Sequence, residues 1–283
     1  MRIITWNIQW GRGADGRIDT ARTIDAINAI GGADLICLQE VAQNFPELKG
    51  GDTGDEIAIF SAAFPKHEPV FAAGLDVPDG AGGRARFGNL ILSGLAVDQV
   101  FRHLLPCPVD PGLPAMQRSC AEAVVSAPWG PLRVLTTHLE YYSALQRTAQ
   151  VAALRALQDE VAGLARAASV VGESSPTFAA RPRPVSAVLC GDFNCEPGSA
   201  EYALMGAAPA PTVPTWRDAW CVAHPRVPHA PTVGLHGAEW PDRAYCCDFL
   251  WVSDDLADRV AGVSVDANTA ASDHQPVVLE LRP

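Results

Sequence analysis

The sequence has no apolar run approaching the ~20 residues that a membrane-spanning helix requires. Its opening, Met1-Arg-Ile-Ile-Thr-Trp-Asn7, lacks the apolar stretch and small-residue cleavage site of a signal peptide. The eight cysteines form no Cys-x-x-Cys pair and no zinc-type spacing with histidine, which favours reduced thiols, although an even count leaves disulfides open. We therefore expect a cytoplasmic protein that has no membrane partner.

Positive charge is also scarce. The chain has 21 Lys and Arg residues against 32 Asp and Glu residues, a formal net charge of -11, and no basic tract. Because phosphate neutralisation supplies most of the non-specific affinity for duplex DNA, tight sequence-independent binding to long DNA is disfavoured. A phosphorylated small molecule or a nucleic-acid end fits this charge balance better as a substrate, and no obligate protein partner is inferred.

The 283 residues, 48% of them hydrophobic, are enough to form a large core. Residues 143–168 have aliphatic side chains at helical spacing and predict the longest helix, whereas residues 75–83 and 172–184 predict mobile loops. The absence of a repeat and of a linker between halves predicts one α/β domain over residues 1–283. Short apolar runs predict buried strands at residues 2–6, 34–40, 89–93, 97–105, 121–126, 131–139, 186–190, 245–253, 260–265 and 276–281.

The segment Val188-Leu-Cys-Gly-Asp-Phe-Asn-Cys-Glu196 is a buried strand that ends in polar side chains. Asp192 and Asn194 lie two positions apart, so both side chains leave the same face if the chain stays extended. A carboxylate there can hold or deprotonate a water, and an amide can donate to a phosphate oxygen. An Asx-type turn that closes the strand is the ordinary alternative.

Polar residues flank several other predicted strands in the same way. Each has an ordinary alternative: an asparagine can close a turn, a glutamate can cap a helix, an aspartate can pair with an arginine, and a histidine can be a satisfied core residue. Together they are hard to explain as turns, because buried acids need a metal or hydrogen-bond donors to offset desolvation. These residues are Asn7, Glu40, Asn89, His138, Asp248, Asp273 and His274.

Seven segments that carry these residues resemble, in order, the successive motifs of the endonuclease/exonuclease/phosphatase superfamily, to which DNase I belongs. The resemblance implies a four-layer α/β/β/α sandwich, two packed mixed β-sheets flanked by helices, with an active site at one edge. It also implies a Mg²⁺-dependent or Mn²⁺-dependent hydrolase of phosphoester bonds. The segments are Thr5-Trp-Asn7, Leu38-Gln-Glu40, Gly88-Asn-Leu-Ile-Leu-Ser93, Thr137-His-Leu139, Gly191-Asp-Phe-Asn194, Asp248-Phe-Leu250 and Ser272-Asp-His274.

Through this resemblance, Glu40 would be the principal metal ligand, with Asn7 beside it and Asp273 available to the same ion or a second one. Oxygen ligands favour Mg²⁺ or Mn²⁺ over Zn²⁺. Asp192 would orient or deprotonate the attacking water, and Asn194 would hold a phosphoryl oxygen.

The resemblance also assigns roles to two histidines. His274 would contact the phosphate, with Asp248 hydrogen-bonded to its far ring nitrogen. His138 would bind the phosphate or assist the leaving oxygen. Whether Asp192 or His274 is the general base stays open at this point.

Candidate substrate contacts lie outside these motif positions or at their edges. Arg86 and Arg118 could bind a second phosphate, although solvated arginines are the ordinary alternative. Aromatic side chains could stack on a ring of the substrate, although aromatics more often pack in a core; these are Trp10, Tyr141 and Tyr142. The remaining candidates are Asn89 and His236.

We expect a Mg²⁺-dependent phosphoesterase that hydrolyses a phosphodiester or a phosphomonoester. The first alternative is a DNA repair endonuclease or exonuclease, or a tyrosyl-DNA phosphodiesterase-like enzyme, a group that Thr5-Trp-Asn7 resembles. The second alternative is a non-catalytic interaction module of the same fold, which is disfavoured because no proposed catalytic position has been replaced.

Overall fold

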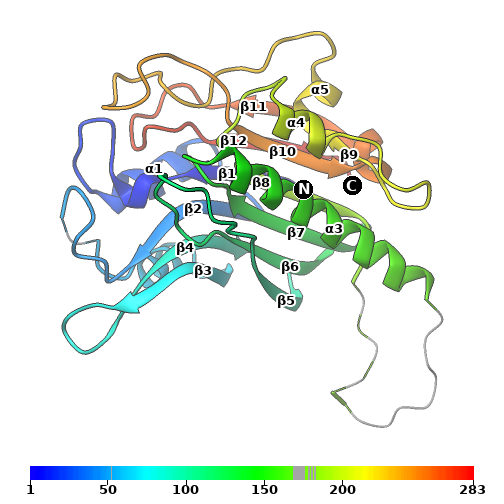
Figure 1. Cartoon of the computed structure of the whole chain (residues 1–283), viewed down its shortest axis with the longest axis horizontal. Coiled ribbons are helices and arrows are strands. Elements are labelled where there is room, and N and C mark those ends of the chain that lie inside the picture. The colour runs from blue at the N-terminus through cyan, green and yellow to red at the C-terminus, as the bar shows by residue number, and fades with distance from the viewer. Residues whose placement is uncertain (52, 168–175, 178, 180, 182) are drawn as a thin grey trace.

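The computed structural model describes residues 1–51, 53–167, 176–177, 179, 181 and 183–283. In this part of the chain, two mixed β-sheets of six strands each are flanked by helices (Figure 1). This arrangement confirms the expected four-layer α/β/β/α sandwich. No helix among the described residues combines the length and the apolar character needed to cross a membrane.

The first sheet has the strand order β11-β12-β1-β2-β4-β3. Strands β1 and β2 are parallel neighbours, and the other pairings in this sheet are antiparallel. Its strands are β1 (Arg2–Asn7), β2 (Leu35–Gln43), β3 (Glu68–Pro78), β4 (Arg84–Ser93), β11 (Val260–Val265) and β12 (Val277–Leu281).

The second sheet has the order β5-β6-β7-β8-β10-β9 and repeats this plan, with one parallel pair, β7 and β8, among antiparallel pairs. Its strands are β5 (Val97–Leu104), β6 (Ser119–Ala127), β7 (Gly130–His138), β8 (Ala187–Asp192), β9 (Trp216–Asp218) and β10 (Asp248–Ser253).

Each parallel pair is connected by a long crossover that contains a helix, as parallel strands require. The helix between β7 and β8, α3, starts at the N-cap Ser143, whose side chain accepts a hydrogen bond from the Gln146 amide. The helices are α1 (Thr20–Ala29), α2 (Glu56–Ala63), α3 (Ala144–Arg166), α4 (Ala200–Met205) and α5 (Ala219–Ala223), with 3-10 turns η1 (Gln9–Gly11) and η2 (Asp254–Arg259).

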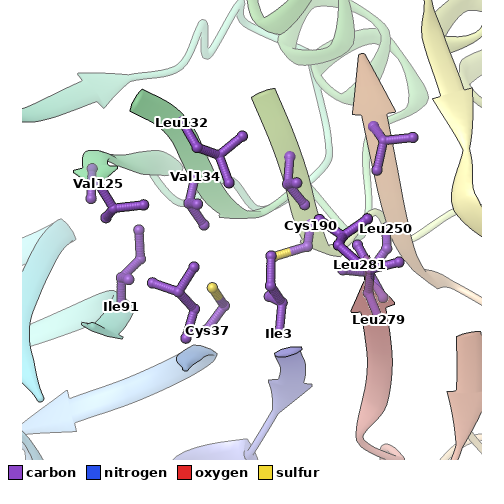
Figure 2. Close-up of a cluster of buried hydrophobic side chains, with 14 of the residues drawn as sticks. Ile3, Cys37, Ile91, Val125, Leu132, Val134, Cys190, Leu250, Leu279 and Leu281 are labelled. Carbon is purple, nitrogen blue, oxygen red and sulfur yellow. The ribbon is translucent and has the colours of Figure 1, made fainter. Parts of the chain in front are cut away.

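The main core lies between the two sheets. Figure 2 shows Ile3, Cys37 and Ile91 from the first sheet facing Val134 and Cys190 from the second. These side chains alternate along their strands with residues that point to the outer faces, as the pleat of a strand dictates. The inner faces therefore form one apolar layer that holds the sheets together.

Two further cores lie under the outer helices. Ile27 of α1 and Phe60 of α2 pack on the outer face of the first sheet. Val151 and Leu154 of α3 and Met205 of α4 pack on the outer face of the second, which α3 crosses in Figure 1. The strand ends stay uncovered by these helices, so polar side chains can gather there.

One of the two predicted loops is partly a strand. The loop expected at 75–83 is wrong over 75–78, because β3 runs to Pro78 and pairs with β4. Residues 75–78 include Asp76 and Pro78, which are typical of a loop, but Asp76 pairs across the β3–β4 hairpin with Arg84 at 2.7 Å. The loop expected at 172–184 lies largely outside the described residues.

Candidate active site

Strand ends from both sheets meet at one edge of the sandwich. In the first sheet, the last residue of β1, Asn7, pairs with Gln39 of the parallel strand β2, next to Glu40. In the second sheet, His138 at the end of β7 pairs with Asp192 at the end of β8. Parallel strands place their carboxyl ends side by side, which is where α/β proteins commonly bind ligands.

Asn7 connects the two sheets through its side-chain amide. Its Nδ2 atom donates to Glu40 Oε1 at 3.0 Å and to Asp192 Oδ2 at 2.9 Å. Its Oδ1 atom accepts from the Gln9 backbone amide at 3.1 Å. One buried amide therefore fixes the distance between a carboxylate of each sheet.

Glu40 owes its position to an irregularity in β2. The pairing of β2 with β4 shifts register between Leu38 and Val41, and Glu40 has a φ of 58°. A bulge of this kind re-aims a side chain, and a positive φ is uncommon for a residue other than glycine. Behind the bulge, the buried Glu56 accepts from the Ala42 amide at 2.7 Å and supports this part of the strand.

Asp192 is held by main-chain and side-chain donors. Its Oδ1 atom accepts from the backbone amide of Asn194 at 2.8 Å, while Asn7 holds Oδ2. The preceding residue, Gly191, has a φ of 136°, and a Cβ atom there would lie 1.9 Å from the Thr137 carbonyl oxygen. Only glycine lets β8 approach β7 closely enough to present Asp192 in this way.

His274 is a buried cation in this site. Its Nδ1 atom lies 2.9 Å from Asp248 Oδ2, and its Nε2 atom lies 3.7 Å from Asp192 Oδ2. Burial alone would lower the pKa of His274, but the charges of Asp248 and Asp192 outweigh it and raise that pKa well above its usual value. Thr232 donates to the same Asp248 oxygen at 2.6 Å and fixes the pair.

His138 has the opposite protonation state. Burial, and then the positive charge of Arg118, lowers its pKa to about 3, so the ring is neutral at neutral pH. The Nδ2 atom of Asn194 lies 2.9 Å from His138 Nε2 and also donates to the Leu139 carbonyl at 2.9 Å. Because an amide nitrogen donates, His138 Nε2 accepts, and the ring proton is on Nδ1, 3.7 Å from Glu40 Oε1.

The ionised forms of two other acids in the cluster, Glu40 and Asp273, are disfavoured. Burial, and then the charge of Asp273, raises the pKa of Glu40 to about 7. Burial also raises the pKa of Asp273, although the charge of His274 opposes that shift. Gln9 Nε2 donates to Asp273 Oδ2 at 2.7 Å. A cation bound here would relieve the repulsion between these acids.

The donor set fits a hard divalent cation. No described residue hydrogen-bonds to Glu40 Oε2, which leaves this atom available to a metal ion. The potential ligand atoms of Asn7 and Asp273 are also oxygens. Oxygen donors of this kind are the ligands of Mg²⁺ and Mn²⁺. Cys247, Asp248 and His274 also have ligand-type atoms within 4.8 Å of one another. In that group, however, Asp248 Oδ2 already bonds Thr232 and His274 Nδ1.

Two of the predicted substrate contacts lie at the site. Asn89 and Arg118 line a small pocket together with Glu40 and His138. The Nδ2 atom of Asn89 donates to a backbone carbonyl of β6 at 2.9 Å, and its buried Oδ1 atom has no partner among the described residues. Arg118 donates from Nε to Glu140 Oε2 at 3.2 Å.

Two other predicted contacts, Arg86 and His236, have local partners instead. Arg86 binds Asp76 at 3.2 Å and Gln43 at 3.0 Å, along the β3–β4 hairpin. His236 is bonded to the Ala267 carbonyl at 2.9 Å. Within the described part of the chain, neither has a hydrogen bond or ion pair to a residue of the site.

Sequence reasoning missed several supporting residues. Gln9, which holds Asp273, follows Asn7 by two positions, and that proximity was a usable signal. Thr232, which holds Asp248, lies in a proline-rich loop far along the chain and had no signal. Glu140, which holds Arg118, follows the predicted strand of His138 and could have been included on that ground.

The sequence matches a family model, and the fold is similar to those of solved structures. The model of the Endonuclease/Exonuclease/phosphatase family matches residues 4–274. No curated protein matches the sequence. Among solved structures, an endonuclease/exonuclease/phosphatase from Beutenbergia cavernae is 21% identical with a TM-score of 0.65, over 100% of this chain and 71% of that chain.

Two solved structures similar to this chain have more specific names. A 3′ phosphatase from Neisseria bound to a product DNA hairpin is 20% identical, with a TM-score of 0.61 and 100% coverage of both chains. A mannosyl-6-phosphatase from Bacteroides thetaiotaomicron is 16% identical, with a TM-score of 0.63 and 99% coverage of both chains. At these identities the likeness establishes the fold alone.

Proposed function

The chain belongs to the endonuclease/exonuclease/phosphatase family, and on that premise we propose that it is a Mg²⁺- or Mn²⁺-dependent hydrolase of phosphoester bonds. The observation that carries this proposal is the meeting of Glu40 and Asp192, from different sheets, around the amide of Asn7. The cationic His274 lies at the same point, 3.7 Å from Asp192. Carboxylates, an amide and an imidazolium gathered at one edge are suited to a phosphoryl group and a divalent cation.

The opposite protonation states of the histidines favour Asp192 as the general base. A His274 ring that is already an imidazolium cannot accept a proton from water, whereas it can donate from Nε2 to a phosphoryl oxygen. Asp192 Oδ2 lies 3.7 Å from that donor, and as a carboxylate oxygen it can accept a proton from a water molecule bound beside it. Asp248 then acts as a positioning residue that keeps His274 charged and oriented.

Asn194 has a positioning role in this proposal. Its amide nitrogen is engaged by His138 and by the Leu139 carbonyl, which leaves no free donor for a phosphoryl oxygen. Through these bonds it holds the neutral His138 with the Nδ1 proton directed toward Glu40. His138 and the charged Arg118 are therefore the donors we assign to the substrate on this side of the site.

Glu40, with Asn7 and Asp273, would hold the metal ion. A bound divalent cation supplies Lewis-acid stabilisation of the charge that builds on the phosphoryl oxygens. The raised pKa of Glu40 supports this assignment, because a bound cation would offset the burial and the negative charge of Asp273 that disfavour its anion. Mg²⁺ and Mn²⁺ are the candidates because every proposed ligand atom is oxygen.

The proposed substrate is a phosphomonoester or phosphodiester, either in a small molecule or at the end of a nucleic acid. The net charge of -11 argues against a protein that grips long duplex DNA. A DNA-repair nuclease remains the alternative enzyme. It predicts cleavage of plasmid or abasic DNA in the presence of Mg²⁺.

The test is a screen of phosphoesters with Mg²⁺ or Mn²⁺, in which phosphate or alcohol release is measured. It includes p-nitrophenyl esters, sugar phosphates, nucleotides, and single-stranded and abasic DNA. We expect hydrolysis by the wild-type chain that EDTA abolishes, and a loss of at least about a hundredfold in Glu40→Gln and in Asp192→Asn.

The matched control is Asp159→Asn, which removes an exposed carboxylate on α3, away from the site. It should leave the rate unchanged. Hydrolysis that survives in both active-site variants, or that is insensitive to EDTA, would contradict the proposal. A folded wild-type chain that cleaves no ester in the screen would favour the non-catalytic module.

A further inference from the structure

A cleft of about 390 Å³ opens beside Asn194, and none of the proposed metal ligands lines it. Trp240 and Tyr245 line it, and Tyr141 packs against Trp240. Tyr142 completes the group by contact with Tyr141. We call the hollow, its two lining rings and the adjoining rings of Tyr141 and Tyr142 the aromatic cleft.

The four rings stand edge to face rather than in a stack. The ring centroids of Tyr141 and Trp240 are 5.2 Å apart at an interplanar angle of 89°. Tyr141 and Tyr142 meet at 4.8 Å and 82°, and Trp240 and Tyr245 at 6.2 Å and 86°. Perpendicular rings present both faces and edges to one guest, which suits a planar aromatic ring better than a flexible chain.

These aromatics are not core residues. Tyr142 is 58% exposed, Tyr141 40% and Trp240 36%. Among the described residues, none donates to or accepts from the three tyrosine hydroxyls or Trp240 Nε1. Exposed aromatic rings gathered at the mouth of a site, with their polar atoms free, are typical of a recognition surface.

The tyrosine pair is held in place before any ligand arrives. Arg147 Nη1 donates to the Glu140 carbonyl at 2.8 Å and to the Tyr141 carbonyl at 3.1 Å. The Glu140 carboxylate accepts from the Tyr142 amide at 3.0 Å, and the Glu140 amide donates to Gln150 at 2.8 Å. A surface already ordered in this way loses little conformational entropy on binding.

The cleft is also connected to the catalytic centre. Glu140, which holds the tyrosine pair, also accepts from Arg118 at 3.2 Å, and Arg118 lies with His138 in the small pocket of the active site. Burial, and then negative charges that include Asp192, raises the pKa of Tyr245. Asn194 lines the cleft and lies 2.9 Å from His138 Nε2, so the cleft borders the catalytic centre directly.

The charges of the cleft argue against a second phosphate. Arg147 pairs with Glu201 at 3.0 Å, and Arg243 pairs with Glu196 at 3.1 Å. The guanidinium of Arg243 also covers the Tyr245 ring, 4.6 Å from its centroid. With both cations paired to carboxylates and a further carboxylate, Asp242, in the lining, an uncharged guest is favoured over an anionic one.

We propose that the aromatic cleft binds the heteroaromatic base of a nucleotide substrate, next to a phosphate held by His274 and Arg118. The proposal rests on the proposed function for the position of that phosphate. It narrows the substrate to a nucleotide or a single-stranded nucleic-acid end. Stacking on aromatic side chains binds any base, so the cleft would discriminate little between bases.

The test compares two ligands that share a phosphorylated ribose and differ in the base. Binding of adenosine 5′-monophosphate and of ribose 5-phosphate is measured by quenching of tryptophan fluorescence, in the presence of Mg²⁺ and before turnover. We expect the nucleotide to bind at least about fivefold more tightly, the lower end of what one stacked base contributes. Glucose 6-phosphate is included as a phosphorylated sugar without a base.

Two variants assign the preference to the cleft. Tyr142→Ala and Trp240→Phe should each reduce the advantage of the nucleotide by about threefold or more and leave ribose 5-phosphate binding unchanged. The control is Trp129→Phe, in the turn before β7, at the opposite end of the strand that carries His138. It should bind all three ligands as the wild-type chain does.

The outcomes separate this proposal from the proposed function. Equal affinity for nucleotide and ribose phosphate, or a nucleotide preference that both cleft variants retain, would overturn the base assignment even if the chain hydrolyses esters. Tighter binding of glucose 6-phosphate would overturn it in favour of a sugar. A chain that hydrolyses nothing but binds the nucleotide through Tyr142 and Trp240 would support the cleft while contradicting the hydrolase.

Discussion

The side chains of Asn7 and Asp192 come from different sheets, and the Asn7 amide donates a 2.9 Å hydrogen bond to the Asp192 carboxylate. The same nitrogen also holds Glu40. Asn7 therefore fixes the proposed metal ligand relative to the proposed base. In the closed environment of the site, both carboxylates depend on this one donor for their relative orientation.

Replacement of Asn7 by alanine should therefore reduce kcat strongly. We expect a loss of about a hundredfold, comparable to the removal of a preorganised donor from an enzyme site. The free energy of unfolding should fall by only about 1–3 kcal/mol, because buried acceptors lose one partner. Initial rates on a cleaved ester and urea denaturation measure the two effects. Asn28→Ala, on the exposed face of α1, is the control, and an unchanged kcat in Asn7→Ala would refute the linking role.

Metal affinity should rise with pH. Burial and the charge of Asp273 raise the pKa of Glu40 to about 7 in the metal-free protein. Since a cation must displace the Glu40 proton, the apparent affinity for Mg²⁺ should increase up to about tenfold per pH unit below pH 7 and level off above it. Calorimetric titration with Mn²⁺ over this range measures the slope. A flat profile would mean that Glu40 does not bind the ion.

The same carboxyl should destabilise the metal-free protein at high pH. A carboxyl whose pKa is raised on folding contributes less stability as pH rises from its usual value of 4.5 through about 7, because the folded state holds the proton more tightly. Glu40→Gln should thus raise the metal-free Tm at about pH 8 and leave it nearly unchanged at about pH 5. Thermal denaturation at both pH values, with Asp159→Asn as the exposed control, measures this difference.

Much of the fold could be predicted because its central strands are covered on both faces. The segments of β1, β2 and β8 are apolar runs, since one face packs in the inter-sheet core and the other under a helix. The edge strand β3 was missed although residues 69–73 are apolar, because Gly74, Asp76 and Pro78 in its second half are typical of a loop. Strand β9 was also missed, because its three residues, Trp216–Asp218, are too few to form an apolar run.

Whether a residue of the site could be predicted also depends on where it lies in the fold. Asn7 and Asp192 were predictable because each directly ends a buried strand, and strand pairing brings those ends together. Thr232 lies in a loop whose path depends on contacts distant in sequence, so its bond to Asp248 has no local signal. Arg86 was assigned to the substrate from its charge alone, and a local partner, Asp76, accounts for that charge.

Loss of the Asp248 charge should move the alkaline limb of the pH–rate profile. Burial lowers the pKa of His274, and the charges of Asp248 and Asp192 raise it above its usual value. In Asp248→Asn the largest raising charge is gone, so His274 should lose its proton at a lower pH and kcat should decline earlier on the alkaline side. The profile of kcat against pH measures the shift, and the His274 proton signal in NMR reports the same titration directly.

Thr232→Val provides the control for that shift. It removes a hydrogen bond to Asp248 Oδ2 but keeps the carboxylate charge. The alkaline limb should therefore move less than in Asp248→Asn. If both variants keep the wild-type profile, another group carries the proton-dependent step.

Substitution of Gly191 should disrupt the site through the backbone rather than through chemistry. Gly191 has a φ of 136°, and a Cβ atom at this position would lie 1.9 Å from the Thr137 carbonyl oxygen, a contact that no side-chain rotation can relieve. In Gly191→Ala, β8 must therefore move away from β7, which separates Asp192 from His138. We expect a loss of unfolding free energy of about 3 kcal/mol or more together with a loss of activity.

Gly163 in α3 is the matched control, because a Cβ atom there would meet nothing within 4 Å. Gly163→Ala should stabilise the chain by about 0.5–1 kcal/mol through helix propensity and leave activity intact. Denaturant unfolding of both variants gives the comparison. If Gly191→Ala folds with wild-type stability and activity, the close approach of β8 to β7 does not position Asp192, and the geometric basis of the site would have to be sought in the side-chain bonds from Asn7 and Asn194.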